Sequence, residues 1–460
     1  MKGLSRVLVA NRGEIAVRII RACRKLGIES VVTVSEIDRD SLPARLADRA
    51  VCIGPPSPME SYLKVDTIIT AALGTGSDAI HPGYGFLAEQ PQLAEACAAH
   101  HLVFVGPKAD DLKKMGDKLY ARKLAGQVGV SIIPGSELVR HLKEAADAAD
   151  QIGFPVLLKA AAGGGGKGMK IVPRAEDLKA VFNEASLEAL SAFGDDRLYV
   201  EHYIPNARHI EVQIIGDCHG NIIHLFERDC SLQRRYQKMV EESPSPAVSP
   251  ELREKICEAA VRIARQIGYE NAGTVEFMLD QDHGQFYFLE MNTRIQVEHP
   301  VTEMISGVDL VKEQFRVAAG ESFSVSQADI RLTGHAIECR INAESPGAGF
   351  SPCPGTVTEW KPPEGEDVRV DSHCYSGYFV PPHYDSLLAK LITRGADRHE
   401  AIDVMQNALS DFIVRGLDTT IPFHRFIMKH PEYRNGNIST NWIENCLVKE
   451  YEKNEGNPFR

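Results

Sequence analysis

The sequence predicts three domains, the first of the α/β class and the other two of the α+β class. Two observations lead to this prediction. Over residues 1–114, short apolar runs alternate with helical patterns, whereas residues 115–330 and 331–447 mix helices with strands of hairpin type. At roughly 150 residues per domain, the 460 residues suggest two to four domains. The polar residues 448–460 are expected to form a frayed tail.

The first domain is predicted to hold a parallel, doubly wound sheet. Residues 14–26 carry apolar side chains at helical spacing and Gly27 follows as a stop, and residues 67–73 form a second helical pattern before Gly74. Strands are expected between these helices, at residues 6–10, 30–34, 79–80 and 103–105. Strands that alternate with helices in this way are typical of a Rossmann-like arrangement.

The second and third domains show longer strands and at least one hairpin. In the second, strands are expected at 154–159, 199–203 and 209–215, a helix at 251–267, and a hairpin formed by 274–280 and 286–291. In the third, strands are expected at 335–341, 356–360 and 385–392, with a helix at 400–412. No internal repeat or low-complexity tract interrupts this pattern.

Composition excludes several functional classes. The formal net charge of −12 argues against a general nucleic-acid binder, although a local basic pocket stays compatible with it. The ten cysteines include no C-x-x-C pair, so the usual zinc and redox spacings are missing. We see neither a signal peptide nor an apolar stretch approaching the roughly 20 residues of a membrane span, and we expect a cytoplasmic protein that meets no membrane.

A glycine-rich loop predicts phosphate binding. Five of the six residues at 163–168 are glycine, namely Gly163, Gly164, Gly165, Gly166 and Gly168. Such a segment suits backbone N–H groups that approach an anion closely, in a loop that opens and closes. A flexible surface linker is the alternative, but the loop follows an apolar run that ends at Lys159. Neither a Walker A motif nor a G-x-G-x-x-G motif is present, so a dinucleotide site on the first domain is not expected.

Two lysines are candidate phosphate ligands. Lys159 ends an apolar run, and a buried ammonium group needs an anionic partner, for which a phosphate is suitable. Lys118 opens the next unit and is a second candidate, although a solvated helix lysine explains it equally well.

The hairpin at 274–291 predicts a metal site. If its turn centres near His283, Glu276 lies directly opposite Glu290, and two like charges in that position repel each other. A divalent cation between them removes the repulsion, and Asn292 points the same way as Glu290. Carboxylate and amide oxygens suit Mg²⁺ or Mn²⁺ with bound phosphates. The alternative is an exposed hairpin face, which the many apolar neighbours make less plausible.

Residues 294–298 suggest an anion site with a base. Arg294, Gln296 and Glu298 alternate with apolar residues and are expected on one face of a strand. Arg294 can hold a carboxylate-like anion through two hydrogen bonds, and Glu298 can act as a base. The solvated side of an edge strand is the alternative. The basic run at 233–238 is interpreted as part of the same anion pocket.

Several motifs in one order resemble the biotin carboxylases of the ATP-grasp superfamily. They are MGDK at 115–118, the glycine loop, QRRYQK at 233–238, EMNTRIQVEH at 290–299, ANRGEI at 10–15, HPGYGFL at 81–87, ECRINAE at 338–344 and YDS at 384–386. The resemblance covers nearly the whole chain, from about residue 6 to about residue 445. It implies a Rossmann-like N-terminal domain, an ATP-grasp domain with a mobile lid at about 131–203, and a biotin carboxylase C-terminal domain.

The resemblance also implies a role for individual residues. It implies that ATP is held by Lys118, Lys159, Met169, Glu201, His202, Ile204, His209, Gln233 and Tyr236 under the glycine loop, and Mg²⁺ or Mn²⁺ by Glu276, Glu290 and Asn292. It implies that bicarbonate is held by Lys238, Arg294, Gln296, Val297 and Glu298, and biotin by Tyr84, Arg340 and Asp385. Glu298, Arg294, Arg340 and Lys238 are then the catalytic residues.

Tyr236, which is expected beside the nucleotide, departs from the family pattern. The family usually has histidine where this chain has Tyr236, and His202 and Ile204 are also slightly unusual. A tyrosine hydroxyl can still donate a hydrogen bond, so altered nucleotide contacts are expected rather than loss of activity.

The resemblance further implies partners. No biotin-bearing lysine motif is found, so biotin is expected on a separate biotin carboxyl carrier protein. The enzyme that receives the carboxyl group is expected to be a carboxyltransferase subunit, and the assembly a homodimer. An acetyl-CoA or propionyl-CoA carboxylase is the expected parent complex, and a pyruvate or other keto-acid carboxylase is the alternative. Another ATP-grasp ligase joining a carboxylate to an amine, and a non-catalytic ATP-binding protein, are the remaining hypotheses.

Overall fold

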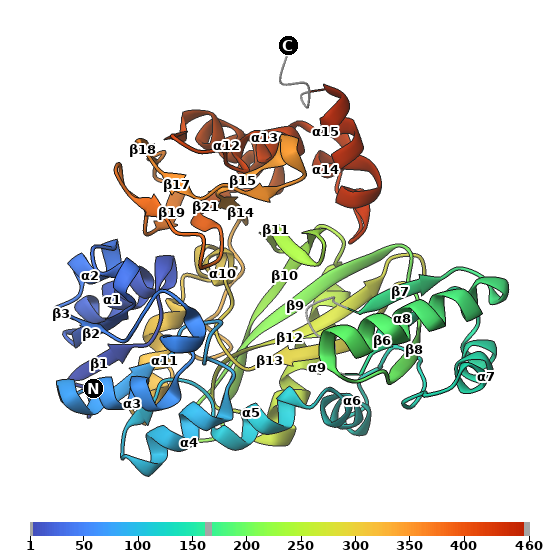
Figure 1. The fold of residues 1–460 in the computed structure, drawn as a ribbon, viewed down its shortest axis with the longest axis horizontal. Helices are drawn as coiled ribbons and strands as arrows, with labels where there is room; N and C mark the ends of the chain where they lie inside the picture. The colour runs from blue at the N-terminus through green and yellow to red at the C-terminus, as the bar shows by residue number, and fades with distance from the viewer. Residues whose placement is uncertain (1–2, 162–167, 455–460) are drawn as a thin grey trace.

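The computed structural model describes residues 3–161 and 168–454 of the chain. Its first sheet is parallel, with the strand order β3-β2-β1-β4-β5 (Figure 1). The five strands are β1 (Arg6–Val9), β2 (Glu29–Val34), β3 (Arg49–Cys52), β4 (Ala79–His81) and β5 (Val103–Phe104). The order reverses between β1 and β4, which places the loops after these two strands together at one edge of the sheet.

Both faces of this sheet are covered, as a doubly wound fold requires. Val7 and Val9 pack with α1 (Gly13–Leu26), whereas Leu8 packs on the opposite face with α3 (Val65–Thr75) and α4 (Pro91–Ala99). The expected end of the second helix at Gly74 is wrong by two residues. The helix continues to Thr75 because Gly76 is the residue that adopts the left-handed conformation, with φ +66°, and caps it.

An eight-stranded antiparallel sheet forms the centre of the molecule, in the order β13-β12-β9-β10-β11-β14-β21-β19. Its strands are β9 (Ala207–Gly216), β10 (Ile222–Arg234), β11 (Gln237–Ser243), β12 (Asn271–Asp280), β13 (Gln285–Asn292), β14 (His335–Asn342), β19 (Val368–Ser372) and β21 (Leu387–Gly395). The sheet is continuous across the expected domain boundary near residue 330, because β11 pairs with β14. The pairing of these strands is long-range, and the sequence pattern did not predict it.

Helices cover this sheet and connect it to the first domain. They are α5 (Ala109–Gly116), α6 (Lys118–Gln127), α9 (Pro250–Ile267), α10 (His299–Ser306) and α11 (Leu310–Ala318), with α2 (Leu42–Leu46) in the first domain. Among the described residues, no helix is both long and apolar enough to cross a bilayer.

A small unit with its own core lies at one end of the large sheet (Figure 1). It contains β6 (Val156–Ala160), β7 (Met169–Val172), β8 (Leu198–His202), α7 (Leu142–Ile152) and α8 (Leu178–Phe193). Its three strands form a separate sheet in the order β7-β6-β8. This unit falls within the expected lid segment 131–203.

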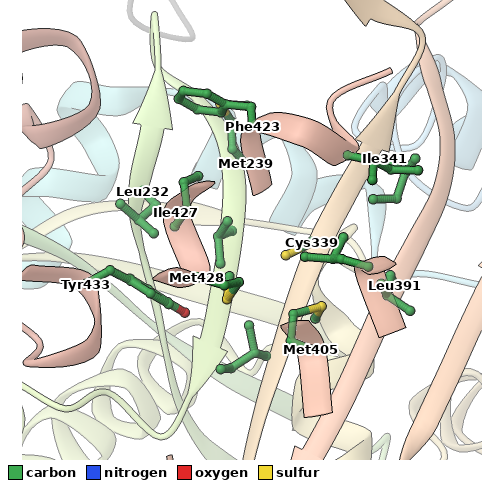
Figure 2. Packing of buried hydrophobic residues seen from close by; sticks show 14 of the residues in the cluster. Leu232, Met239, Cys339, Ile341, Leu391, Met405, Phe423, Ile427, Met428 and Tyr433 are labelled. Atoms are coloured by element: carbon green, nitrogen blue, oxygen red, sulfur yellow. The ribbon is translucent and has the colours of Figure 1, made fainter. Parts of the chain in front are cut away.

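The C-terminal region shares a core with β11 of the central sheet. Figure 2 shows Met239 of β11 and Cys339 of β14 packed with Met405 and Met428. These last two residues come from α12 (Arg398–Asp411) and α13 (Ile421–Lys429), which follow the sheet in the chain. The packing holds the third region against the second.

Two expectations for the C-terminal region are wrong. Residues 356–360 are not one strand but divide between β17 (Gly355–Thr356) and β18 (Glu359–Lys361), which pair with β20 (Phe379–Val380) and β22 (Ile413–Arg415). The expected tail is ordered through residue 454, because α15 (Val448–Asn454) places Tyr451 against Phe423 in the same core. The other short elements are β15 (Glu344–Ser345), β16 (Ser351–Pro352) and α14 (Pro431–Arg434).

Candidate active site

One cavity of about 860 Å³ lies where the three regions meet. It is lined by the loops after β1 and β4, by the small β6–β8 unit, by one face of the central sheet and by the segment 383–385. The described residues predicted for the site all line it, except Gly168 and Glu298. Gly163 to Gly166 lie outside the described residues. Side chains from motifs that are about 300 residues apart in the sequence therefore line one cavity.

The β6–β8 unit brings Lys159 beside Glu201. Lys159 forms an ion pair with Glu201, and Arg122 binds the same carboxylate. The burial of Lys159 was expected to require an anionic partner, for which a phosphate is suitable, and within the protein Glu201 supplies such an anion. Lys118 lies across the cavity at the start of α6, with its Nζ 3.9 Å from Oε2 of Glu290.

Part of the cavity wall is formed by the end of β8, by the two residues that follow it, and by residues 440–444 near the C-terminus. His202, Tyr203 and Ile204 line it, and Asn441 donates a hydrogen bond of 2.8 Å to the Tyr203 hydroxyl. Glu444 also lines it and accepts a 2.8 Å hydrogen bond from the backbone N–H of Arg235. Sequence reasoning missed Asn441 and Glu444, because nothing in their local pattern places them near residues 200–236.

The basic run at 233–238 is a hairpin turn and not one anion-binding face. Arg235 and Tyr236 occupy the two central positions between β10 and β11 with φ of +47° and +64°, as a tight hairpin turn requires. Arg234 turns away, with its guanidinium 4.2 Å from the ring centre of Phe350. Tyr236 is 53% exposed at the rim of the cavity. Lys238 alone of the three basic residues enters the charged cluster described below.

The hairpin register at the expected metal site is confirmed. Glu276 is paired with Glu290 across β12 and β13, and the register shifts only after this pair. Glu276 is buried, and its oxygens lie 3.1 Å from Nζ of Lys238 and 3.2 Å from Nε2 of His209. Glu290 is more open to the cavity, with a side chain 40% exposed.

The two hairpin carboxylates differ in charge environment. Burial opposes ionisation of Glu276, but Lys238 and His209 outweigh it and hold the pKa of this carboxyl well below its usual range. Although the side chain of Glu290 is 40% exposed, the cavity walls partly desolvate its carboxyl, and this desolvation together with the negative charge of Glu276 raises the pKa of Glu290. A cation at Glu290 would relieve this penalty. With the amide oxygen of Asn292 on the same strand, these oxygen donors fit Mg²⁺.

Lys238 is at the centre of three buried carboxylates. Its Nζ lies 2.6 Å from Glu211, 3.1 Å from Glu276 and 2.6 Å from Glu298. Burial disfavours the ammonium form, but the three carboxylates outweigh burial and raise the pKa of Lys238 well above its usual value. Glu211 is held in turn by Arg228, which is fully buried. His209, Glu211 and Gln213 alternate along β9, and the polar face that they form is buried.

Glu298 has one cation on each carboxylate oxygen. Oε1 accepts from Lys238 at 2.6 Å and Oε2 accepts from Arg340 at 2.9 Å. The side chain is 0% exposed and lies behind these two cations. Burial and the nearby Glu211 favour the neutral acid, but Lys238 and Arg340 outweigh them and lower the pKa of Glu298. The carboxylate is therefore ionised at neutral pH, as a base must be.

The strand expected at 294–298 is not formed. Residues 293–298 make an irregular segment between β13 and α10, whose first turn contains Pro300. Their side chains still converge, since Arg294 donates to Oε1 of Gln296 at 2.6 Å and to Oε2 of Glu89 at 2.8 Å. Glu89 comes from the first domain, and no sequence pattern pointed to its role here.

The residues expected to hold biotin come from three separate segments of the chain. Arg340 donates from Nε to Glu241 at 2.6 Å, which fixes the plane of its guanidinium. The Tyr84 hydroxyl donates to Glu14, and Asp385 accepts from the backbone N–H of Leu387 at 2.9 Å. Tyr84, Arg340 and Asp385 all line the cavity.

Comparison with known proteins agrees with this arrangement. Three family models match in sequence order: "Biotin carboxylase, N-terminal domain" at residues 3–112, "Carbamoyl-phosphate synthase L chain, ATP binding domain" at 117–326 and "Biotin carboxylase C-terminal domain" at 338–445. The chain belongs to the biotin carboxylase family. It is therefore an ATP-grasp ligase that forms a carbon–nitrogen bond.

Some similar proteins are named biotin carboxylase, and another is named as a subunit of pyruvate carboxylase. The chain is 52% identical to Biotin carboxylase 1 of Bacillus subtilis, over 96% of this chain and 98% of that protein. It is 53% identical to a pyruvate carboxylase subunit of Methanothermobacter thermautotrophicus, over 96% of this chain and 89% of that protein. A biotin carboxylase crystal structure from Campylobacter jejuni is 46% identical, covers 96% of this chain and 98% of its own, and has a TM-score of 0.92.

Proposed function

We propose that this chain carboxylates biotin carried on a separate protein, using ATP and bicarbonate, with carboxyphosphate as the intermediate. The main supporting observation is the environment of Glu298. An ionised, fully buried carboxylate is held between Lys238 and Arg340, in a cavity that also receives Lys159 and Glu290. A base, anion-binding cations and nucleotide-binding candidates thus share one enclosed space, as a multistep reaction with a short-lived intermediate requires.

In the first step, bicarbonate is bound beside Lys238, Arg294, Gln296 and the backbone of Val297. Glu298 takes the bicarbonate proton, and a bicarbonate oxygen forms a bond to the γ-phosphorus while the bond to ADP breaks. Lys238 already touches Glu298, so it can follow the negative charge from the carboxylate to the bound anion. The products of this step are ADP and carboxyphosphate.

In the second step, carboxyphosphate breaks down to CO₂ and phosphate. The phosphate takes the proton from the ureido nitrogen of biotin, and this nitrogen forms a bond to CO₂. Arg340 stabilises the negative ureido oxygen, and its orientation is fixed by Glu241 and Glu298. Water must be kept out until this transfer is complete, for which the β6–β8 unit and the glycine loop are the proposed lid.

The nucleotide is proposed to lie between the β6–β8 unit and the central sheet. Lys118, Lys159 and His209 would face its phosphates, and Glu201, His202 and Ile204 its base, with Gln233 and Tyr236 near the ribose and Met169 under the loop. Glu276, Glu290 and Asn292 would hold Mg²⁺ or Mn²⁺, which when bound neutralises the phosphate oxygens. The proposed domain boundaries are 1–114, 115–330 and 331–447.

We propose that the chain is the ATP-dependent component of an acetyl-CoA or propionyl-CoA carboxylase. The partners are then a biotin carboxyl carrier protein, a second copy of this chain and a carboxyltransferase subunit. Relatives named biotin carboxylase support this setting, whereas the relative named as part of a pyruvate carboxylase supports a keto-acid carboxylase as the alternative. A cytoplasmic location is part of the proposal, since all ten cysteines are free.

Two other functions account for fewer of the observations. A ligase joining a carboxylate to an amine would need the ATP site, but not the placement of Arg340 and Tyr84 in the same cavity. A non-catalytic ATP-binding protein would not need an ionised base, yet Glu298 is present with both of its cationic partners.

ATP hydrolysis measured with and without bicarbonate, and with and without free biotin, tests the proposal. We expect hydrolysis that depends on bicarbonate and increases several-fold when free biotin is added. Folded protein that hydrolyses ATP without bicarbonate, or shows no response to biotin under any condition, contradicts the proposed function.

A further inference from the structure

A fully buried lysine joins the three regions of the molecule behind the cavity. Lys390 of β21 is 0% exposed, and its Nζ donates to the backbone carbonyl of Val297 at 2.8 Å. The same Nζ lies 3.1 Å from Oε1 of Glu14, at the start of α1. It is also 4.0 Å from Asp371, which is bound mainly by Arg369. Lys390 thus contacts the first domain and the segment beside Glu298 at once.

Glu14 extends this connection to the other side of the cavity. Its Oε1 accepts from the Tyr84 hydroxyl as well as from Lys390, and the side chain is 2% exposed. Its second oxygen is buried without a hydrogen-bond partner among the described residues. Because the only hydroxyl hydrogen of Tyr84 is used by Glu14, the Tyr84 oxygen presents lone pairs, and not a hydrogen, to the cavity.

The register of the central sheet places this bridge beside the catalytic arginine. Lys390 is the direct partner of Arg340 across β21 and β14, so the two side chains lie on the same face. Arg340 reaches Glu298, whereas Lys390 reaches the carbonyl of the preceding residue, Val297. Two adjacent cations on one face of the sheet therefore hold two consecutive residues of the same short segment.

We propose that Glu14 and Lys390 are positioning residues that connect the tyrosine facing biotin with the bicarbonate segment at Val297. The inference rests on the proposed function. Through Glu14, Lys390 fixes the Tyr84 hydroxyl as an acceptor for a ureido N–H. Through the Val297 carbonyl, it fixes the peptide plane next to the base. The two substrates then meet in a fixed relative position, although neither positioning residue reacts.

Kinetics of Glu14→Gln, Lys390→Met and Tyr84→Phe test this role. Glu14→Gln keeps the shape but replaces one of the two oxygens that can accept from the Tyr84 hydroxyl with an N–H donor, so we expect the KM for free biotin to rise at least fivefold. Lys390→Met keeps the chain length, and we expect it to raise the KM values for both biotin and bicarbonate. The KM for ATP should stay within about twofold in each variant. Combining Glu14→Gln with Tyr84→Phe should raise the KM for biotin no further than the larger single effect.

Glu242→Gln is the matched control. Glu242 is also buried and ion-paired in the same sheet, but its partners His335 and Arg398 lie away from the cavity lining. We expect it to lower the melting temperature and leave both KM values unchanged. If Glu14→Gln and Lys390→Met behave like this control, or if the Glu14 and Tyr84 effects multiply, the positioning role is wrong.

The same assay on the wild-type protein distinguishes failure of the positioning role from failure of the proposed function. Wild-type protein that shows no biotin-stimulated, bicarbonate-dependent hydrolysis overturns both proposals. Stimulated wild-type protein with unchanged KM values in the folded Glu14→Gln variant overturns the positioning role alone. That variant retains its value as a test if Lys390→Met does not fold, since it leaves the buried lysine bound to Val297.

Discussion

At the scale of single residues, Glu298 has the clearest proposed chemical role. It is ionised because Lys238 and Arg340 outweigh its burial, and each of them occupies one carboxylate oxygen. The pair of cations also explains why a residue without direct exposure to the cavity can serve a bound substrate. When an anion replaces the carboxylate as the partner of Lys238, one oxygen of Glu298 becomes available to accept a proton.

Glu298→Gln is expected to reduce turnover at least 100-fold and to change ATP affinity by less than threefold. The amide cannot accept the bicarbonate proton, but the residue makes no contact with Lys159 or Glu201 at the nucleotide end. Steady-state kinetics and a nucleotide-binding titration measure the two quantities. Loss of ATP binding in parallel with turnover would argue against the role of base.

Glu290→Gln is expected to raise the Mg²⁺ concentration needed for half-maximal activity about tenfold. Glu290 is the more exposed of the two opposed carboxylates, and its replacement removes one charged oxygen donor while Glu276 stays held by Lys238 and His209. Activity measured against Mg²⁺ concentration, with Glu242→Gln as the control, gives the comparison. An unchanged Mg²⁺ requirement would mean that the hairpin pair does not hold the metal.

At the scale of elements, buried ion pairs connect the strands of the central sheet to the helices around it. Glu242 of β11 lies 2.8 Å from His335 of β14 and 2.6 Å from Arg398 of α12. Burial favours its neutral form, but Arg398 and His335 outweigh burial and lower the pKa of Glu242 to about 2. In an unfolded chain a glutamate titrates near a pKa of about 4.3.

This difference predicts how stability depends on acid. The folded pKa is the lower one, so the stabilisation is complete above the unfolded pKa and is lost as the pH falls from about 5 towards 2. Its size is about 3 kcal/mol, on the scale of about 1.4 kcal/mol per pKa unit. Urea unfolding at several pH values should show a smaller loss between pH 5 and pH 3 in Glu242→Gln than in the wild type. Equal losses would contradict the ion-pair account.

The elements also show why some features could be predicted from sequence and others could not. The Glu276–Glu290 pair was predictable because a hairpin register follows from local turn geometry, whereas Glu211 and Lys390 act through strands distant in sequence. Residues 294–298 were assigned to a strand because their polar and apolar side chains alternate. The alternation was real, but this segment has no strand partner and runs directly into α10.

At the scale of the whole molecule, the site depends on all three regions. Tyr84 and Glu14 come from the first domain, Lys238 and Glu298 from the second, and Arg340 and Lys390 from the third. The doubly wound first sheet and the types of the main elements follow from local periodicity. The continuous eight-stranded sheet does not, because the β11–β14 pairing joins residues about a hundred positions apart. The C-terminal α15 was missed because its polar composition conceals Tyr451.

Assembly is the prediction that belongs to this scale. We expect a homodimer, whose mass in sedimentation equilibrium at micromolar concentration is twice the chain mass of 50.7 kDa. A single species of monomer mass at that concentration would contradict it.

Transfer of labelled carbon from bicarbonate to biotin tests the central claim most directly. With ATP, Mg²⁺, ¹³C-bicarbonate and free biotin, the wild-type protein should form labelled carboxybiotin, detected by mass spectrometry after trapping at alkaline pH. Glu298→Gln should form none above background. ATP hydrolysis without any label on biotin, under conditions where the protein is folded, would contradict the proposed reaction.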